Sequence, residues 1–333
     1  MAHSPRVTIV VSTDSSFETS RRSTELLLDQ TRLDLIHLVL VGPSIEEMKP
    51  DLDVLSKFGA YDIVEFGEFE TTGAALAAGM RNAKGDFLVY LEEHGFPPPD
   101  FIEKLVTAFD ETGNDVVGYG LLPSNPGAVS WAHIYIQFGG AVPPRPSGFQ
   151  KRLGPHHVSY RVSTLKGETE HLDKLLSNEA AYHEKLRKEG KKLYFHGDLA
   201  LLHAQISDFK QLFLHEFLSG VTFADTRRHA QNWSLLRRAI YVLGAPLIPF
   251  WRTFRAMGDM YISGRLFKWP QVPFIMLAAT CAGAAGEVVG YTFGTNKRIN
   301  DRRSGFELDR FAYVNDADMK AAPRTAEDAR NIG

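Results

Sequence analysis

The stretch of sequence that decides the fold reads Asp86-Phe87-Leu88-Val89-Tyr90-Leu91-Glu92-Glu93-His94 and runs on into Gly95-Phe96-Pro97-Pro98-Pro99-Asp100. Five successive apolar residues, rich in aromatic and branched side chains, predict a strand that is buried on both faces of a parallel sheet. The strand ends on two carboxylates and an imidazole, and the three prolines prevent its continuation. Ligands of open α/β sheets bind beyond the carboxyl ends of the strands, so this tip is a candidate site. Glu92 and His94 are suitable ligands for Mn²⁺ or Mg²⁺, and the alternative is a solvated acidic turn that caps the strand.

Strands and helices alternate along the first 120 residues. The predicted strands are Val7–Val11, Leu35–Val41 and Tyr61–Phe66, besides the strand that precedes Glu92. The predicted helices run from Ser15 to about Gln30, from Gly73 to Met80 and from Asp100 to Glu111. This alternation predicts an α/β fold, a mostly parallel Rossmann-like sheet with helices on both faces.

The middle of the chain is less regular. Residues 115–155 are rich in glycine and proline, which predicts long loops with a short strand or helix that shape a cleft. Beyond them we predict a strand over Val158–Leu165, a helix over Asp173–Glu189 and short strands over Leu193–Phe195 and Leu199–His203.

One acidic side chain stands out on the predicted helix. Leu175, Glu179, Tyr182 and Leu186 recur at helical spacing and form a single inward face. A buried carboxylate on an apolar face is energetically costly unless it is paired or functional. Burial would also raise its pKa toward that of a working base. Glu179 is therefore a candidate general base, and the alternative is a structural pair with an arginine.

Composition limits the class of protein. The chain has 333 residues, a formal net charge of −3 and one cysteine, Cys281. These values are typical of a globular protein without an internal disulfide, as expected in a reducing compartment. We expect no signal peptide, because the apolar run Val7–Val11 gives way at once to polar residues.

The last third of the chain has a different character. Between Arg227 and Trp269, eight basic side chains stand against Asp259 alone, and three of the four tryptophans lie in the same region. Arginines among tryptophans and leucines favour an anionic membrane surface as a partner and not nucleic acid. Trp269–Gly286 carries no charge and contains Pro273. It is interfacial or re-entrant, membrane-spanning, or buried in a soluble core, and its length of about 27 Å as a helix does not decide among these.

These motifs resemble glycosyltransferase family 2, whose members have the GT-A fold. The resemblance covers roughly residues 5–295, and its most specific part is the block Gly79–Glu93. The segment Val158–Arg161, the helix with Glu179 and the strand ending at His203 are also similar to the family. The segments after Phe217 and Gly286 are similar to a membrane-associated bacterial subgroup. Two features depart from the family pattern. Glu92-Glu93-His94 replaces the usual Asp-x-Asp, and Val39-Leu40-Val41-Gly42-Pro43-Ser44 lacks the usual aspartates of the second strand.

The resemblance implies roles for individual residues. Glu92 and His94 would hold Mn²⁺ or Mg²⁺, and Glu179 would be the catalytic base. The implied donor-binding residues are Ser12, Thr13, Asp14, Arg81 and Glu92. The implied acceptor-binding residues are His156, His157 and Tyr160.

The sequence as a whole therefore predicts an inverting glycosyltransferase of polysaccharide biosynthesis. It would transfer a sugar from a nucleotide-diphosphate donor to a lipid-linked or glycan acceptor at the cytoplasmic face of a bacterial inner membrane. We predict a GT-A-like domain over residues 1–226, a membrane-associating helical region over 227–314 and a flexible tail over 315–333. The rival hypothesis is a catalytically silent relative that acts as a scaffold or as a sugar-nucleotide-binding subunit.

Overall fold

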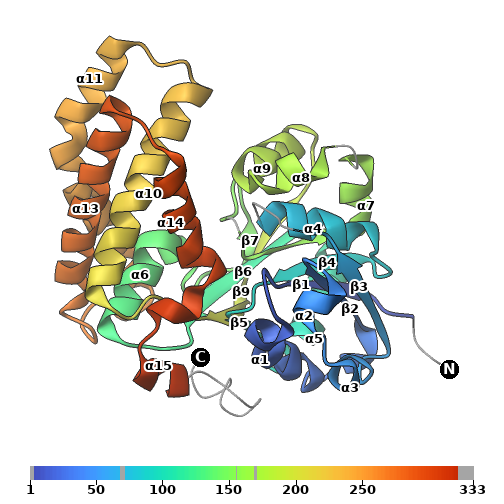
Figure 1. The fold of residues 1–333 in the computed structure, drawn as a ribbon. Coiled ribbons are helices and arrows are strands. Elements are labelled where there is room, and N and C mark those ends of the chain that lie inside the picture. The colour runs from blue at the N-terminus through green and yellow to red at the C-terminus, as the bar shows by residue number, and fades with distance from the viewer. Residues whose placement is uncertain (1–3, 68–71, 155, 169–170, 322–333) are drawn as a thin grey trace. The chain divides into compact units, whose positions relative to one another are not determined.

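The computed structural model describes residues 4–321 except 68–71, 155 and 169–170 (Figure 1). It contains two compact units, which are described one at a time. The first comprises the described residues up to Leu122 together with Pro143–His203. The second comprises Pro123–Val142 and the described residues from Ala204 onward.

The first unit is built on one sheet. Within the described residues its nine strands have the order β3-β2-β1-β4-β8-β6-β9-β5, and β7 pairs with β9. The parallel strands are β3 (Ala60–Glu65), β2 (Ile36–Gly42), β1 (Val7–Ser12) and β4 (Phe87–Leu91). The remaining strands are β5 (Gly95–Phe96), β6 (Val116–Pro123), β7 (Gly148–Phe149), β8 (Val158–Arg161) and β9 (Leu193–His203). The predicted parallel sheet is confirmed for β1–β4, and β8 adds to it in the antiparallel sense.

Helices cover the parallel part of the sheet. Every residue of β1 and β2 is buried, as expected for central strands with helices on both faces. The helices α1 (Phe17–Leu28), α4 (Thr72–Arg81) and α5 (Phe101–Thr112) lie close to the predicted ranges. Two short helices, α2 (Ile45–Met48) and α3 (Leu52–Leu55), separate β2 from β3. Helix α4 packs on β1 and β2, and a Cβ at Gly79 would come within 2.4 Å of Val10 Cγ2, so this packing requires glycine.

The structure corrects the prediction of a single helix over Asp173–Glu189. The chain forms α8 (Leu172–Leu176) and then α9 (Glu179–Lys188). Asn178 between them is an N-cap whose side chain accepts a hydrogen bond from the amide of Ala181 at 3.3 Å. A capping side chain competes with helix continuation, so a new helix begins at Glu179.

Three further predictions are corrected. Residues 115–155, expected to be mostly loops, contain the whole of β6 and the helix α6 (Ala128–Phe138). The predicted strand Val158–Leu165 ends at Arg161 and continues as the short helix α7 (Val162–Leu165). The two short strands near residue 200 are one strand, β9. At Gly197 within it, a Cβ would come within 1.8 Å of the Arg145 carbonyl oxygen, so the glycine reflects a close backbone approach and not a strand end.

The second unit is helical. Besides α6 it contains α10 (Phe209–Ala230), α11 (Leu235–Gly244), α12 (Ile248–Ile262), α13 (Val272–Thr292), α14 (Lys297–Leu308) and α15 (Asp316–Ala321). Helices α10 and α13 pack together along their length through glycines (Figure 1). A Cβ at Gly286 would come within 2.0 Å of the Phe217 carbonyl oxygen, and one at Gly290 within 2.3 Å of the Val221 carbonyl oxygen. The two backbones therefore touch, an arrangement that only small residues permit.

Among the described residues, α13 alone is long and apolar enough to cross a membrane. Half of its most apolar window is buried inside the protein, and it buries the carboxylate Glu287. The predicted boundaries at residues 226 and 314 stay a prediction. Of the predicted tail, residues 316–321 form α15, and residues 322–333 lie outside the described part of the chain.

Candidate functional site

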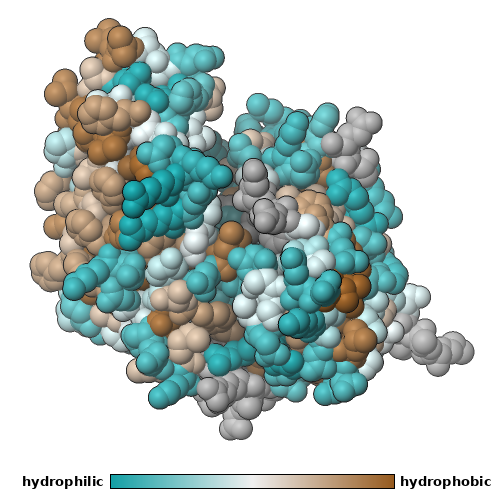
Figure 2. Space-filling model, in the orientation of Figure 1, coloured by the Kyte–Doolittle hydropathy of each residue, from teal (hydrophilic) through white to brown (hydrophobic). Residues whose placement is uncertain are grey.

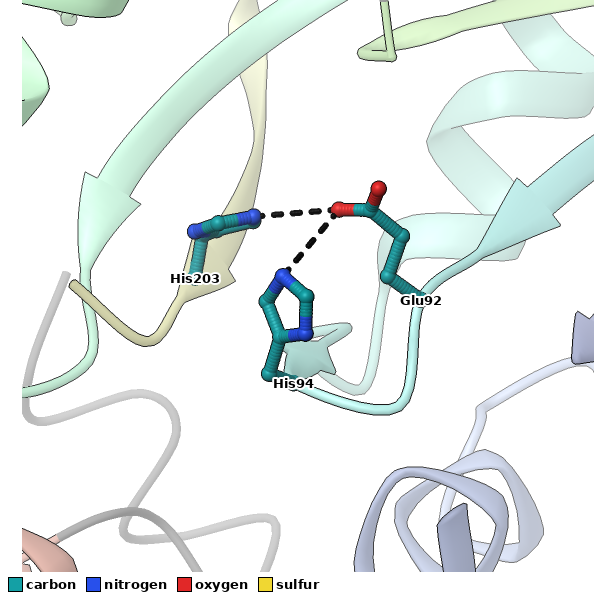
Figure 3. A group of neighbouring side chains, drawn as sticks. All are labelled: Glu92, His94 and His203. Carbon is teal, nitrogen blue, oxygen red and sulfur yellow. Dashed lines mark hydrogen bonds and ion pairs between the residues drawn. The ribbon is translucent and has the colours of Figure 1, made fainter. Parts of the chain in front are cut away.

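Strand pairing builds a three-residue cluster at the tip of β4. Glu92 follows β4 directly, and the chain then turns so that Gly95 of β5 pairs with His203 at the end of β9. His94 directly precedes Gly95, so this strand pairing brings His94 close to His203. Glu92, His94 and His203 point toward one another from these two segments (Figure 3).

The contacts within this cluster converge on one carboxylate oxygen. His203 Nε2 lies 3.1 Å from Glu92 Oε2, and His94 Nε2 lies 3.3 Å from the same oxygen. The two imidazole rings meet edge to face, with centroids 4.5 Å apart. All three side chains are largely shielded, with exposed fractions of 13% for Glu92, 2% for His94 and 6% for His203.

The two imidazoles determine the charge of the carboxylate. Burial alone would raise the pKa of Glu92, but the interactions with His203 and then His94 outweigh it and hold that pKa well below its usual value. Glu92 is therefore ionised at neutral pH. An ionised, shielded carboxylate beside two imidazoles is a site for positive charge.

This set of residues fits a divalent metal ion. One nitrogen from each histidine and one oxygen of Glu92 lie within 4.8 Å of one another. Neither ring nitrogen of His94 makes an aligned hydrogen bond within the described part of the chain. Two imidazoles and one carboxylate suit Mn²⁺ among other transition metals better than Mg²⁺, which prefers an oxygen-only shell.

Three of the predicted donor-binding residues, Ser12, Thr13 and Asp14, lie at the carboxyl end of β1. Ser12 is linked to β4 by a hydrogen bond of 2.7 Å between its Oγ and the Tyr90 hydroxyl. The Thr13 hydroxyl donates to the Ser16 carbonyl at 2.9 Å and so supports the turn into α1. Asp14 is exposed and lines an open pocket. The other residues that line this pocket are Ser15, Ser16, Pro43, Glu46, Glu47, Lys49 and Gly67.

The composition of this pocket bears on the missing aspartates of the second strand. The end of β2 contributes Pro43, and α2, which follows it, contributes Glu46 and Glu47. Carboxylates therefore do line this pocket, but they come from a short helix and not from the strand. Their sequence signal is weak, because an acidic first turn of a helix is common at exposed sites.

Arg81 is the last residue of α4 and is exposed. Within the described residues its guanidinium makes no hydrogen bond or ion pair. The structure therefore brings Arg81 together with none of the other predicted site residues, and its role in donor binding stays a prediction.

The predicted base, Glu179, lies in a second cluster. It is the first residue of α9 and is buried, and both of its oxygens accept hydrogen bonds. The Tyr160 hydroxyl donates to Oε1 at 2.6 Å, and the His156 backbone N–H donates to Oε2 at 2.6 Å. The predicted inward face is confirmed in part: Tyr182 and Leu186 are buried on the same helix, whereas Leu175 lies on α8 and is half-buried.

Tyr160 is the centre of this second cluster. Burial and the neighbouring Glu179 carboxylate raise the pKa of Tyr160 well above its usual value, so its hydroxyl remains a donor. The same hydroxyl lies 2.9 Å from His183 Nε2. Burial lowers the pKa of His183, which favours the neutral imidazole.

His156 connects the two clusters. Its backbone N–H binds Glu179, and its ring Nδ1 lies 4.0 Å from Glu92 Oε1. It is the most exposed of the predicted acceptor-binding residues and has a positive φ of 68°, an uncommon conformation for a side chain of this size. His157 is buried behind it, where a Cβ at Gly154 would collide with its ring.

Two members of these clusters were not among the predicted site residues. His203 is 111 positions from Glu92 in the chain, and only the pairing of β5 with β9 brings them together. The sequence signal was a strand that ends on a histidine, which is more often a packing residue. His183 lies one position after Tyr182 on α9, and nothing in its spacing distinguished it.

The parallel sheet and the charged cluster beyond the end of β4 define a GT-A-like α/β protein with a candidate ligand site at the carboxyl ends of its strands. Residues 46–175 match the model of the family described as glycosyl transferase family 2. This match contains β3, β4, Glu92, His94 and Tyr160, and it confirms the predicted family, fold class and enzyme class. Over this segment, which is less than half of the chain, the protein is similar to the family 2 glycosyltransferases.

Several solved structures are similar to this chain. One is the crystal structure of S. aureus TarS 1-349, with 13% identity, a TM-score of 0.46 and coverage of 88% of this chain and 93% of that one. The same protein in complex with UDP gives 14% identity, a TM-score of 0.43 and coverage of 88% and 93%. The complex with UDP-GlcNAc gives 12%, 0.42, 85% and 91%. No curated protein sequence matches this chain significantly.

Proposed function

We propose that this protein is an inverting glycosyltransferase that moves a sugar from a nucleotide-diphosphate donor to a lipid-linked or polysaccharide acceptor at a membrane. The observation that carries the proposal is the cluster of Glu92, His94 and His203 at the carboxyl end of β4. It lies at the edge of the sheet where the Ser12 hydroxyl meets Tyr90. In a sheet of this type, this edge is the place for a ligand.

The leaving group of this reaction is a nucleoside diphosphate, whose developing negative charge must be neutralised. Glu92, His94 and His203 would hold Mn²⁺ for that purpose, and the bound ion would supply the compensating charge. The chain keeps Glu92 ionised through its two imidazole neighbours, so the site attracts a cation before donor arrives. Asp14 and the nearby glutamates of α2 are placed to hold hydroxyl groups of the nucleoside.

Glu179 is the proposed base that accepts the proton of the acceptor hydroxyl. Tyr160 and the His156 amide fix the position of its carboxylate, and this fixed position supports the proposed role. His156 approaches both Glu179 and Glu92. It therefore lies where the acceptor hydroxyl and the donor would meet, and His157 and Tyr160 support it from behind.

Membrane association rests on the surface of the helical unit. Figure 2 shows apolar side chains gathered over α11 and α13. In the helical unit, the large apolar side chains with exposed fractions above 70% are Leu235, Leu236, Leu243, Leu247, Phe254, Phe267, Phe274 and Phe293. An apolar surface of this extent is unusual for a soluble protein and supports interfacial binding.

The packing of α13 favours insertion into one leaflet over a full span. Its glycines contact the backbone of α10, and its Glu287 is paired with Arg252 at 2.6 Å. A helix with these contacts acts as the core of its unit, and the exposed apolar residues of α11 and α12 then supply the membrane contact. We place the protein at the cytoplasmic face of a bacterial inner membrane.

The test of the catalytic proposal is turnover with a panel of nucleotide sugars in the presence of Mn²⁺. We expect at least one donor to be consumed by the wild-type chain and by Glu111→Gln, which changes an exposed glutamate of α5. We expect Glu92→Gln to lose most of this activity with an unchanged far-UV spectrum. Equal turnover in both variants would refute the proposed role of the cluster.

The second candidate function is a silent scaffold or sugar-nucleotide-binding subunit. The observation that favours it is the end of β2, where Gly42-Pro43-Ser44 provides no carboxylate from the strand itself. Binding of a nucleotide sugar without its turnover in the presence of any acceptor preparation would favour this function over catalysis.

Membrane association has its own test, which does not depend on catalysis. Leu243→Asp with Phe254→Asp replaces two highly exposed apolar side chains and should release the protein from anionic vesicles at low salt. Leu52→Asp, on an exposed apolar residue of α3 in the other unit, is the matched control and should remain bound. The proposal would be contradicted if the wild-type protein did not bind anionic vesicles at low salt.

A further inference from the structure

The helical unit contains a cavity that the proposed catalytic mechanism does not use. It has a volume of about 400 Å³ and is lined by residues of α6, α10, α12 and α13. This volume is within the range of small-molecule sites. Two carboxylates line it, Glu216 of α10 and Glu287 of α13, with exposed fractions of 4% and 2%. Buried charge in the middle of a helix bundle is costly and indicates a function.

Each carboxylate has one engaged oxygen and one oxygen left over. Glu216 Oε1 accepts a hydrogen bond from Gln137 Nε2 at 2.7 Å and lies 3.4 Å from His215 Nδ1. Glu287 Oε1 accepts from Arg252 at 2.6 Å. Among the described residues, neither Oε2 atom has a hydrogen-bond donor. Two buried acceptors in one cavity call for a ligand with several N–H or O–H donors.

A missing side chain keeps space beside these groups. A Cβ placed on Gly283 would lie 3.6 Å from Glu216 Oε2 and 3.8 Å from the NH1 atom of Arg252. Burial raises the pKa of Glu287 despite the opposing charges of Arg252 and Arg227. A cation in the cavity would add to the stabilisation that Arg252 already gives the ionised carboxylate.

Donor groups lie nearer to the outside of the same cavity. Arg252 is 36% exposed and uses one nitrogen for Glu287, while Arg255 is exposed and makes no hydrogen bond or ion pair with any described residue. Two guanidinium groups with unused N–H donors suit a phosphate. The cavity thus offers acceptors for a cation at depth and donors for an anion toward its mouth.

The surface beside this mouth is apolar. Trp251 lines the cavity and is 69% exposed, and its neighbours on α12, Phe250 and Phe254, are 63% and 73% exposed. The order from the buried carboxylates to the guanidinium groups and on to an exposed apolar helix matches an amphiphile. Its ammonium would lie deepest, its phosphate next and its hydrocarbon chains outermost.

We propose that this cavity binds the headgroup of a phospholipid that carries a primary ammonium and a phosphate, as phosphatidylethanolamine does. Glu216 and Glu287 accept hydrogen bonds from the ammonium, and the phosphate contacts Arg252 and Arg255. The lipid source of this headgroup rests on the proposed membrane association. The headgroup chemistry rests on the cavity alone.

The test is calorimetric titration of the full chain with two soluble headgroups, glycerophosphoethanolamine and glycerophosphocholine. They differ in the three methyl groups that remove the N–H donors. We expect the ethanolamine compound to bind at least about tenfold more tightly, because a desolvated charge pair that loses its hydrogen bonds costs several kcal/mol. Equal affinities for the two compounds, or no binding of the ethanolamine compound, would overturn the proposal.

Variants locate the binding site. Glu287→Gln and Glu216→Gln should each weaken binding of the ethanolamine compound by about tenfold or more. Asp225→Asn removes a carboxylate on α10 that is paired with Arg228 outside the cavity, and it should leave binding unchanged. If one of the two cavity variants does not fold, the other variant still tests the proposal, and so does the comparison of the two headgroup compounds on wild-type protein.

A flotation assay separates this inference from the proposed function. Vesicles of phosphatidylcholine alone are compared with vesicles that also contain phosphatidylethanolamine or phosphatidylglycerol. Headgroup binding without flotation on any vesicle would refute membrane association and retain the cavity site. Flotation that is indifferent to phosphatidylethanolamine, together with no headgroup binding, would retain membrane association and refute the cavity site.

Discussion

Gly286 provides a direct test of how the helical unit is held together. A glycine in the middle of a helix normally costs about 1 kcal/mol relative to alanine, so Gly→Ala at an open position stabilises. At Gly286 the added Cβ would come within 2.0 Å of the Phe217 carbonyl oxygen and 3.0 Å of the Val221 nitrogen. Both are backbone atoms of α10, which no rotamer change can move. Helices α10 and α13 would have to separate.

The expected magnitude follows from these two opposing effects. Overpacking typically costs about 1–3 kcal/mol, and a collision with backbone belongs at the upper end of that range. After subtraction of about 1 kcal/mol for helix propensity, Gly286→Ala should destabilise by about 2 kcal/mol. For a unit of this size the melting temperature would fall by roughly 4–8 °C. Gly258 on α12 has no atom within 4 Å of a Cβ, so Gly258→Ala should be neutral or stabilise by up to about 1 kcal/mol.

The assay is thermal unfolding followed by far-UV circular dichroism and calorimetry, with both variants in the same detergent buffer. The comparison of Gly286→Ala with Gly258→Ala cancels the general effect of replacing a helical glycine. Equal melting temperatures for the two variants would show that α10 and α13 do not approach as described.

Three further predictions concern single side chains. Glu179→Gln should reduce turnover by about 10²–10⁴-fold with donor affinity little changed, measured by steady-state kinetics, and full activity would move the base elsewhere. Tyr160→Phe should destabilise by about 1–3 kcal/mol in denaturant titrations, because Glu179 and His183 lose a buried partner, and an unchanged midpoint would contradict this. Burial lowers the pKa of His215, but Glu216 and Glu307 raise it more, so its folded-state pKa lies above the ordinary 6.5. This stabilisation is complete below pH 6.5 and is lost as pH rises through the folded-state value. Wild-type protein should therefore lose more stability between pH 6 and 8.5 than His215→Gln does.

Much of the fold was predictable because, in the first third of the chain, the sequence pattern of apolar residues agrees with the burial of their side chains in the structure. The five residues before Glu92 are all apolar or aromatic, and Gly85 and the prolines after Phe96 limit the length of the strand. The helices after β1 and β4 begin where their capping and turn residues indicate. Prediction was poorer where tertiary contacts decide: β9 continues through Gly197 because another backbone segment approaches it there.

The candidate site was only partly predictable for a similar reason. Glu92 and His94 share one strand tip, so the carboxyl end of β4 identifies both. His203 joins them through the pairing of β5 with β9, a short ladder between segments far apart in sequence. The hydrogen bonds of Glu179 depend on the placement of β8 beside β4 and on the break before α9. Neither follows from helical periodicity, which predicted one continuous helix.

The helical unit illustrates the limits of composition. An uncharged stretch of helix reads the same whether lipid or protein surrounds it. Here the glycines of α13 contact the backbone of α10, and only the packed structure shows that its Glu287 is paired with Arg252. The interpretation of the basic and aromatic residues of α11 and α12 as a membrane-binding surface stays a prediction.

The most direct test of the account is donor binding with and without Mn²⁺, measured by thermal shift and calorimetry across a panel of nucleotide sugars. The central claim is that Glu92, His94 and His203 together hold a cation that the donor diphosphate requires. We expect one donor to stabilise the wild-type protein in Mn²⁺ and much less in EDTA. We expect His203→Ala and Glu92→Gln to abolish this difference and Glu111→Gln to preserve it. Donor binding of equal strength in Mn²⁺ and EDTA, or an intact metal effect in both cluster variants, would contradict the account.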